Sequence, residues 1–300
     1  MNLADYLNKY FIIVFLIAMG IGFNFPQLSG FSFATTFLIA FSLFLASLKV
    51  DFDIFLSHLS NLKNIIPKLF AMKIILPLLV FFATMLIIPQ FALGGLLIAA
   101  MPCGMPNIVF ADIFKGNKEL SLFYTILAHI VSPITIPLLV FIVSAQNVSF
   151  DYIGLFSTLL VIVILPFVLA FLVQKFFRTA TQKVSKYLSG ANILLVAVII
   201  AIIIAQNSEK FSSIEALLIP VIYAFGLLFV LCFYGLLLAR KESKENKIAV
   251  SLSAIHPNFA LALGIANQYF SFQELSVLLA GMITVTVFWI FYKKIIDRVK

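Results

Sequence analysis

The sequence is poor in charge and has almost no cysteine. Only 11% of its 300 residues are Asp, Glu, Lys or Arg, against roughly 25% in soluble chains, which excludes a soluble globular domain. Its 2 cysteines, Cys103 and Cys232, both lie within apolar runs, which excludes a disulfide framework and a zinc pattern. The chain also lacks a nucleotide-binding loop and the sequence motifs of zinc proteases and serine hydrolases. We therefore predict neither an enzyme nor a cofactor.

Long apolar runs fill most of the chain. Hydrophobic residues make up 63% and the mean hydropathy is +1.15, and a helix needs roughly 20 apolar residues to cross a bilayer. The sequence therefore predicts an all-α polytopic membrane protein whose surroundings are the lipid bilayer. We expect ten transmembrane helices within a single domain, residues 1–300, at 10–25, 31–49, 67–89, 92–114, 120–145, 153–175, 189–205, 214–238, 248–267 and 274–293.

The basic residues lie on one side of this predicted topology. The net charge is +8, but 18 of the 20 lysines and arginines fall in the loops of one side, which indicates membrane topology and not nucleic-acid binding. The positive-inside rule then predicts that both termini are cytoplasmic, and the short loops suggest a bacterial inner membrane. Lys73 lies inside the third span, and we expect its ammonium to snorkel to the nearby cytoplasmic surface.

Two of the predicted spans contain related interruptions. Pro106-Asn107 in the fourth span and Pro257-Asn258 in the ninth are 151 positions apart, about half the chain. A second repeated motif, Glu-Leu-Ser, occurs at residues 119–121 and 274–276, an offset of 155. The two repeated motifs predict a duplicated five-helix unit, with repeat 1 at about 9–145 and repeat 2 at about 153–294. Because five is odd, the two units are inverted, which gives the 5+5 inverted repeat of many secondary transporters.

Broken helices at the bilayer midplane predict a binding site. Proline removes a backbone donor, and unpaired backbone groups at this depth are tolerated only beside protein or a watery cavity. Half-helix N-termini favour a carboxylate or similar anion, and the carbonyls before each break suit a small cation. We therefore expect a secondary active transporter of a small organic anion, working by alternating access, with a substrate site at Cys103, Gly104, Pro106, Asn107, His256, Pro257 and Asn258.

The sequence resembles the bile acid:sodium symporter family, within a superfamily that includes arsenite efflux permeases and auxin-carrier-type proteins. The resemblance covers essentially the whole chain. It rests on Ile21-Gly22 and Pro26, Leu48 and Asp51, Gly94 to Leu139 with its Lys115-Gly116-Asn117 segment, and Asn258, Leu261 and Ala262. It implies a ten-helix inverted repeat with a panel and a core domain, in which helices 4 and 9 are broken and cross. It also implies uptake of organic anions with sodium.

The resemblance carries over the family's sodium ligands only in part. It implies an ion site that includes Asn107, Ser121, Thr125 and Ser253. The family's Ser-Asn pair is Asn107-Ile108 in this chain, and its glutamate in the ninth span is Ser253. Because the carboxylate is missing, sodium, another ion or no ion at all remain open as the coupling species.

Three alternatives follow from other residues. His129 and His256 lie inside predicted spans and are candidates for proton coupling, since histidine titrates near physiological pH. Cys103 next to the first break would suit trivalent arsenic, which makes a metalloid efflux permease an alternative function. A passive channel or a sensor that transports nothing is the third. The sequence does not distinguish a monomer from a homo-oligomer.

Overall fold

The chain is helical throughout the part that the structure, a computed structural model, describes. That part comprises residues 6–7, 10–50, 62–104, 106–144, 150–211 and 215–299. Within these ranges the one strand-like feature is an isolated antiparallel bridge between Cys103 and Pro257. The predicted repeat boundaries at 9 and 145, and Asp51, lie outside the described residues.

The helices follow one another with short connections. In chain order they are α2 (Phe11–Asn24), η1 (Pro26–Ala34), α3 (Thr35–Ser47), α5 (Leu62–Phe70), η3 (Ala71–Ile75), α6 (Leu76–Ile87), η4 (Pro89–Phe91), α7 (Ala92–Ala100), α8 (Asn107–Ile113), α9 (Lys118–Ser144), α10 (Tyr152–Leu159), η5 (Leu160–Ile164), α11 (Leu165–Phe176), α12 (Arg178–Asn207), η6 (Ser208–Phe211), α13 (Glu215–Leu238), α14 (Lys244–Ile255), α15 (Phe259–Tyr269) and α16 (Phe272–Arg298).

Seven helical stretches among the described residues are long and apolar enough to cross a membrane, and two shorter apolar helices accompany them. This confirms an all-helical chain with several candidate spans. The predicted spans 92–114 and 248–267 are each divided into two short helices, α7 with α8 and α14 with α15. The count of ten spans and their arrangement as a 5+5 repeat remain predictions.

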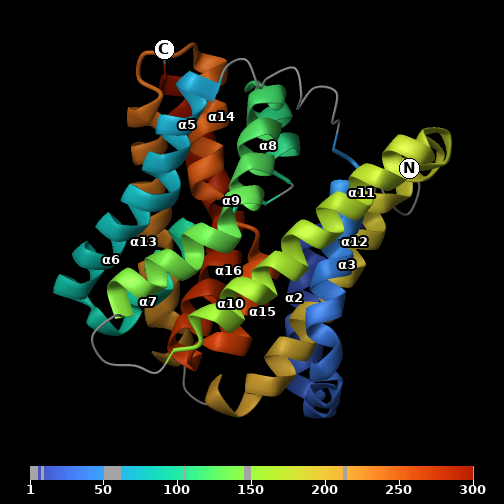
Figure 1. Cartoon of the computed structure of the whole chain (residues 1–300). Helices are drawn as coiled ribbons and strands as arrows, with labels where there is room; N and C mark the ends of the chain where they lie inside the picture. The colour runs from blue at the N-terminus through green and yellow to red at the C-terminus, as the bar shows by residue number, and fades with distance from the viewer. Residues whose placement is uncertain are drawn as a thin grey trace.

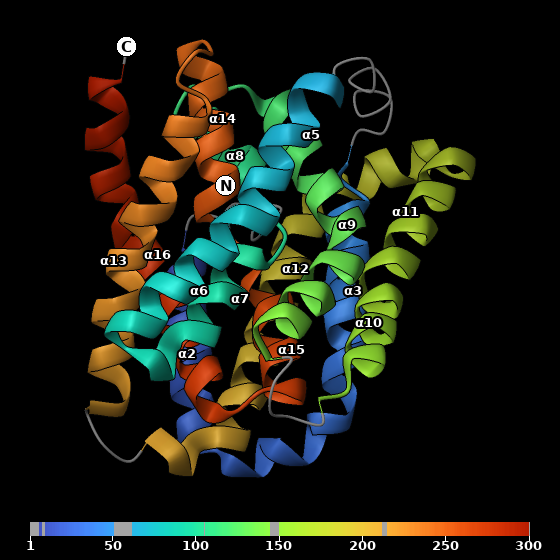
Figure 2. The same ribbon diagram turned by 60° about the vertical axis from the view of Figure 1, so that its left-hand side comes forward.

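The helices form two groups, which we call the panel and the bundle. The panel comprises α2, η1, α3 and α10 to α12, in which α12 packs along α2 and α3 and α11 packs on α3. The bundle comprises α5 to α9 and α13 to α16, in which α13 packs against α14 and α16. The panel lies on the right in Figure 1, and Figure 2 shows α10, α11 and α3 side by side at its edge. Large apolar side chains such as Phe37 and Ile153 are exposed on its surface, as expected for a lipid-facing helix.

One end of the molecule carries the starts of α5 and α14 and the end of α16, at the top of Figure 1. We call it the basic end, because lysines such as Lys68, Lys118 and Lys293 form its ion pairs. The half-helices α8 and α14 make their principal contacts at this end with other bundle helices. At the opposite end α15 packs against the panel helices α12 and α3. Panel and bundle also meet where α9 packs against α10 and η5.

Candidate functional site

The two helix breaks meet and pair through their backbones. Because Pro102 and Pro257 have no N–H, each break leaves carbonyl groups that cannot be satisfied within its own helix. The N–H of Gly104 donates to the carbonyl of His256 at 2.9 Å, and the N–H of Asn258 donates to the carbonyl of Pro102 at 2.8 Å. These two bonds satisfy polar backbone deep in the molecule, and they place five of the predicted substrate residues in one crossing.

Gly104 makes this close approach possible. A Cβ atom at Gly104 would lie 2.8 Å from Nδ1 of His256 and 3.2 Å from the carbonyl oxygen of Pro257. Any larger residue would therefore push the two breaks apart. The glycine in the first break matters for contact between the breaks, and not only for bending its own helix.

His256 lies in an aromatic environment beside the crossing. Its ring centroid is 5.4 Å from that of Phe110 and 5.6 Å from that of Trp289, and the latter two rings stack at 4.2 Å. The side chain is 8% exposed, and its Nδ1 has no hydrogen-bond partner among the described residues. His256 is thus a buried imidazole with one nitrogen left unsatisfied.

Four buried polar side chains lie around the first break and form what we call the buried polar cluster: Asn107, Ser121, Thr125 and Ser253. Asn107 and Ser121 are both 0% exposed, and neither the amide atoms of the first nor the hydroxyl of the second has a partner in the described chain. The Thr125 hydroxyl donates to the carbonyl of Ser121 at 2.8 Å, and that of Ser253 donates to the carbonyl of Ala249 at 2.8 Å. Each of these two hydroxyls keeps an oxygen lone pair for another group.

Cys103 lies beside two members of this cluster, Ser253 and Thr125. Its thiol is fully buried, donates to the carbonyl of Ser253 at 3.1 Å and lies beside the Thr125 hydroxyl. Helix α8, which begins at Asn107, packs on α9, which carries Ser121. Unsatisfied buried polar groups cost roughly 1–3 kcal/mol each, so the cluster is suited to a small polar or ionic guest.

His129 connects the second break to α9. Its Nδ1 bonds to the carbonyl of Thr125 at 2.8 Å, and its Nε2 lies 3.3 Å from the amide nitrogen of Asn258. Since a carbonyl only accepts and an amide NH₂ only donates, these partners assign a neutral ring with the proton on Nδ1. The Asn258 oxygen meanwhile accepts from the N–H of Leu261 and caps α15. Both polar atoms of the Asn258 side chain therefore have partners, one on α9 and one on α15.

Exposure separates the predicted residues into two sets. Pro106 is exposed and Asn258 is half-buried. Members of the buried polar cluster are at most 1% exposed. The sequence placed Asn107 in both the substrate set and the ion set, and in the structure it is as buried as the other three residues of the ion set.

Lys73 is the residue whose position we predicted wrongly. Its side chain does not snorkel: it is 3% exposed, and its Nζ lies 2.8 Å from the carbonyl oxygen of Met101 and 3.3 Å from that of Ala99. The helix around it has π geometry over Ala71–Ile75, a deviation that is frequent at functional sites. A lysine within an apolar run was the available signal, but its direction could not be read from the sequence.

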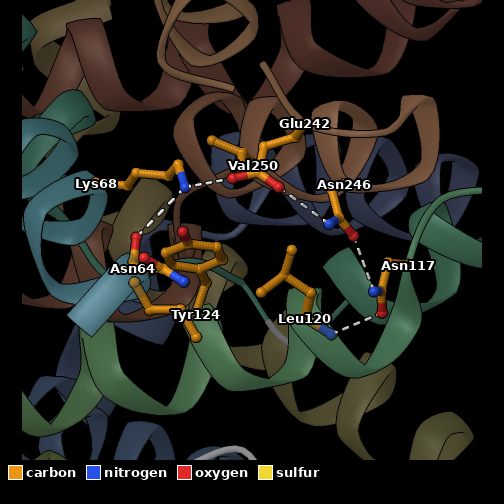
Figure 3. A pocket seen from close by; sticks show the side chains of 9 residues that line it. Asn64, Lys68, Asn117, Leu120, Tyr124, Glu242, Asn246 and Val250 are labelled. Atoms are coloured by element: carbon orange, nitrogen blue, oxygen red, sulfur yellow. Dashed lines mark hydrogen bonds and ion pairs between the residues drawn. The ribbon is translucent and has the colours of Figure 1, made fainter. Parts of the chain in front are cut away.

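A second polar group lies at the basic end, around a cavity of about 250 Å³ between α5, α9 and α14. Figure 3 shows its hydrogen-bond chain from Lys68 through Glu242 and Asn246 to Asn117. The Lys68 ammonium lies 2.6 Å from the Glu242 carboxylate and holds its pKa below the usual value. Asn246 lies between Glu242 and Asn117: its side-chain oxygen accepts from the Asn117 amide at 2.9 Å, and its NH₂ group donates to the Glu242 carboxylate at 3.3 Å. This chain joins the loop before α9 to the loop before α14.

Comparison with known proteins places the chain among transport proteins. The model of the Sodium Bile acid symporter family matches residues 36–214, which is more than half of the chain. That range contains the first break and most of the buried polar cluster.

Three similar proteins come from bacteria and a plant. The chain is 25% identical over 264 residues, 87% of this chain and 81% of the relative, to YocS of Bacillus subtilis, named as an uncharacterized sodium-dependent transporter. It is 29% identical over 192 residues to the Bacillus subtilis protein YbaS, covering 63% of each chain. It is 25% identical over 201 residues to the probable sodium/metabolite cotransporter BASS1 of Arabidopsis thaliana chloroplasts, covering 65% of this chain and 49% of the relative.

Proposed function

Because this chain belongs to the Sodium Bile acid symporter family, it is a membrane transporter and not an enzyme, and we propose that it couples sodium to the movement of a small organic anion. We propose a single ten-helix domain, built as a 5+5 inverted repeat, that works by alternating access at the crossing of the two breaks. The names of YocS and BASS1, which mention sodium, support the choice of coupling ion.

The buried polar cluster is the proposed sodium site, and the unpartnered atoms of Asn107 and Ser121 are the observation that carries the proposal. Sodium is a hard cation, which prefers oxygen ligands. The Asn107 amide and the hydroxyls of Ser121, Thr125 and Ser253 offer four such oxygens. No carboxylate belongs to the cluster, so the ion would be held by neutral dipoles. Such binding suits a monovalent ion that must be released from the site during each transport cycle.

The proposed substrate site is the reachable face of the crossing. Pro106 is exposed there and Asn258 is half-buried, while the N-terminus of the 11-residue helix α15 directs its positive dipole end toward the break. An organic anion would contact the Asn258 amide, with Gly104 and Pro257 forming the backbone floor and His256 and Cys103 behind it. Because Asn258 contacts His129, which bonds to Thr125 of the ion cluster, substrate and ion would share one connected set of side chains.

The proposed orientation places the basic end in the cytoplasm, with both termini on that side of a bacterial inner membrane. The contacts of α15 with α12 and α3 then close the outer side in the described conformation. Whether one copy or several form the working transporter is left to experiment.

Proton coupling through His256 is the second candidate. The unpartnered Nδ1 of this ring favours it, because an added proton would meet no existing donor there. His129 has both ring nitrogens engaged and is a weaker candidate. Replacing His256 with Asn would abolish transport driven by a pH gradient but leave a sodium response in place.

Metalloid efflux has less support in this geometry. The Cys103 thiol is fully buried and donates to the carbonyl of Ser253, which is the environment of a small packing residue. A passive channel or a sensor has no specific observation in its favour.

The first test is the effect of sodium on the unfolding temperature Tm of the purified protein, with choline as the control cation. A ligand that binds only the folded state adds about 1.4 kcal/mol of stability for each tenfold rise in its concentration above Kd. We expect Tm of the wild type to rise with the logarithm of the sodium concentration above Kd, and no sodium-specific rise after Asn107→Ala or Ser121→Ala.

Thr135→Ala is the matched control for this test. Thr135 lies on the same helix α9 as Ser121 and also has an unpartnered hydroxyl, but it is not in the cluster. It should keep the full sodium response. An Asn107→Ala protein with the wild-type sodium response would rule out the proposed site.

A further inference from the structure

Lys73 brings a positive charge to the carboxyl end of the first half-helix. α7 ends at Ala100, and the Lys73 ammonium lies 2.8 Å from the carbonyl oxygen of Met101 and 3.3 Å from that of Ala99. The last carbonyls of a helix have no partner within the helix and carry its negative dipole end. Lys73 therefore occupies the position in which a cation is favoured.

The surrounding chain is built to place the ammonium there. Lys73 is the central residue of the π-helical turn Ala71–Ile75, and turns of this kind are frequent at functional sites. The hydroxyl of Tyr234 donates at 3.3 Å to the carbonyl of Ala71, the first residue of that turn. By contrast, α13, the corresponding helix of the proposed second repeat, is one uninterrupted α-helix.

The ammonium has no carboxylate to balance it. Its two hydrogen bonds both go to carbonyl oxygens, and no Asp or Glu among the described residues forms an ion pair with it. A neutral amine would also offer a lone pair, but both groups bonded to Lys73 are carbonyl oxygens, which only accept, so the contacts match the charged form. Burying an unpaired charge within a membrane is costly, and intramembrane lysines are accordingly functional candidates.

The second break differs at the equivalent place. The last carbonyls of α14 are taken by uncharged donors: that of Ser253 accepts from the Cys103 thiol, and that of Leu252 accepts from the His256 N–H. Among the described residues, only the first of the two half-helix ends thus receives a full positive charge. Lys73 also binds the carbonyl of Met101, two residues before Cys103, whose thiol donates to the carbonyl of Ser253 in the buried polar cluster.

We propose that the Lys73 ammonium is a resident cation of the first helix break. It occupies the carbonyl site at which a transporter with broken helices would otherwise bind a free monovalent cation. Half-helix carboxyl ends and unwound carbonyls are such sites in secondary transporters. One mobile cation is then sufficient for the crossing, and it binds at the buried polar cluster. This last consequence rests on the proposed function, whereas the occupation of the carbonyl site by Lys73 does not.

Lys73→Ala tests the proposal by vacating the carbonyl site. Tm of the purified variant would be measured in ammonium, ethylammonium and sodium chloride, with choline chloride keeping the ionic strength constant. We expect ammonium and ethylammonium to raise Tm by at least about 3 °C, increasingly with the logarithm of their concentration, since a ligand of the folded state alone stabilises it. The wild type should show no such rise with ammonium or ethylammonium.

The sodium arm separates this proposal from the sodium site proposed above. Asn107→Ala should lose the sodium response, and adding Lys73→Ala should restore one, because sodium can then reach the vacated carbonyls. If the wild type does not respond to sodium, the proposed function fails, while the ethylammonium response of Lys73→Ala still decides the present proposal.

Two control variants complete the design. Lys68→Ala removes a lysine from the same span that pairs with Glu242, and it should gain no response to ammonium. Lys73→Met keeps most of the length of the side chain without its charge, and it should fold and show no rise in Tm because its side chain fills the space.

A folded Lys73→Ala protein whose Tm does not respond to any of the three cations would overturn the proposal. If Lys73→Ala folds only when ethylammonium is present during purification, the proposal is supported; failure to recover it under that condition also overturns it.

Discussion

At the scale of single residues, the turn between α8 and α9 depends on an unusual backbone conformation at Lys115. It is the one non-glycine residue in the described chain with a positive φ, at 59°. The N–H of Gly116 donates to the carbonyl of Ala111 at 2.6 Å, and that of Lys115 donates to Asp112 at 3.1 Å. This pair of bonds is the Schellman motif, in which the left-handed position is usually glycine. The lysine therefore adopts the strained left-handed conformation, whereas the glycine that follows it does not.

Lys115→Gly is expected to stabilise the protein by about 1 kcal/mol, because glycine adopts the left-handed region without the steric cost that a Cβ brings. The measurement is Tm in detergent, compared with the wild type at the same salt concentration.

Gly116→Ala should do the opposite. A Cβ at Gly116 would overlap the Ile248 side chain of α14 and lie 3.3 Å from the carbonyl oxygen of Glu245. We expect a loss of about 1–3 kcal/mol, typical of overpacking. Equal Tm values for the two variants would contradict this account of the turn.

At the scale of secondary-structure elements, the defining feature is the contact between the two breaks. The bonds from Gly104 to His256 and from Asn258 to Pro102 hold α7, α8, α14 and α15 in one crossing. Each break on its own would expose polar backbone to an apolar interior, so the two stabilise each other.

Gly104→Ala is predicted to weaken the crossing and reduce transport. The new methyl group would have to displace the His256 ring and the Pro257 carbonyl, at a cost of about 1–3 kcal/mol. Tm and the sodium response should both fall.

Gly226→Ala is the control for this prediction. Gly226 lies in α13, and a Cβ there would meet nothing within 4 Å, so alanine should be neutral or slightly stabilising in that helix. If the two variants behave alike, the close approach at Gly104 has no functional importance.

At the scale of the whole molecule, panel and bundle meet through α15, which packs against α12 and α3, and through α9, which packs against α10 and η5. Gly264 of α15 faces Ile39 of α3, and a Cβ on the glycine would overlap the Ile39 side chain. This contact must open if the transporter alternates between states that face opposite sides of the membrane.

A cross-link between Ile39→Cys and Gly264→Cys, made with a short bifunctional thiol reagent, is expected to stop transport by locking the panel to the bundle. The same treatment of Gly94→Cys with Val277→Cys joins α7 to α16 within the bundle, where a Cβ on Gly94 would lie 2.8 Å from Val277. That second cross-link should leave transport largely intact. Uptake that continues at the wild-type rate after complete cross-linking of the first pair would exclude rigid movement of panel against bundle.

The sequence by itself determined the class of the protein and the location of its two interruptions. Apolar runs long enough to span a bilayer leave little choice but helices, because every backbone group in lipid must be satisfied within its own segment. Proline beside asparagine at matched places in the two halves predicted the breaks, which begin directly after Ala100 and Ile255. These features are local, and local rules are sufficient to read them.

Only the tertiary structure decided which side chains meet at the breaks. The pairing of His129 with Asn258 joins helices that are far apart in the sequence, and the separation of Pro106 from Asn107 by exposure depends on packing from several helices at once. The clearest case is Lys73, which we expected at the membrane surface. Lys73 lies in a π-helical turn and is buried, and its ammonium bonds to the carbonyls at the end of α7. The helix type and the partner both arise from packing between segments, for which the sequence near Lys73 carries no local pattern.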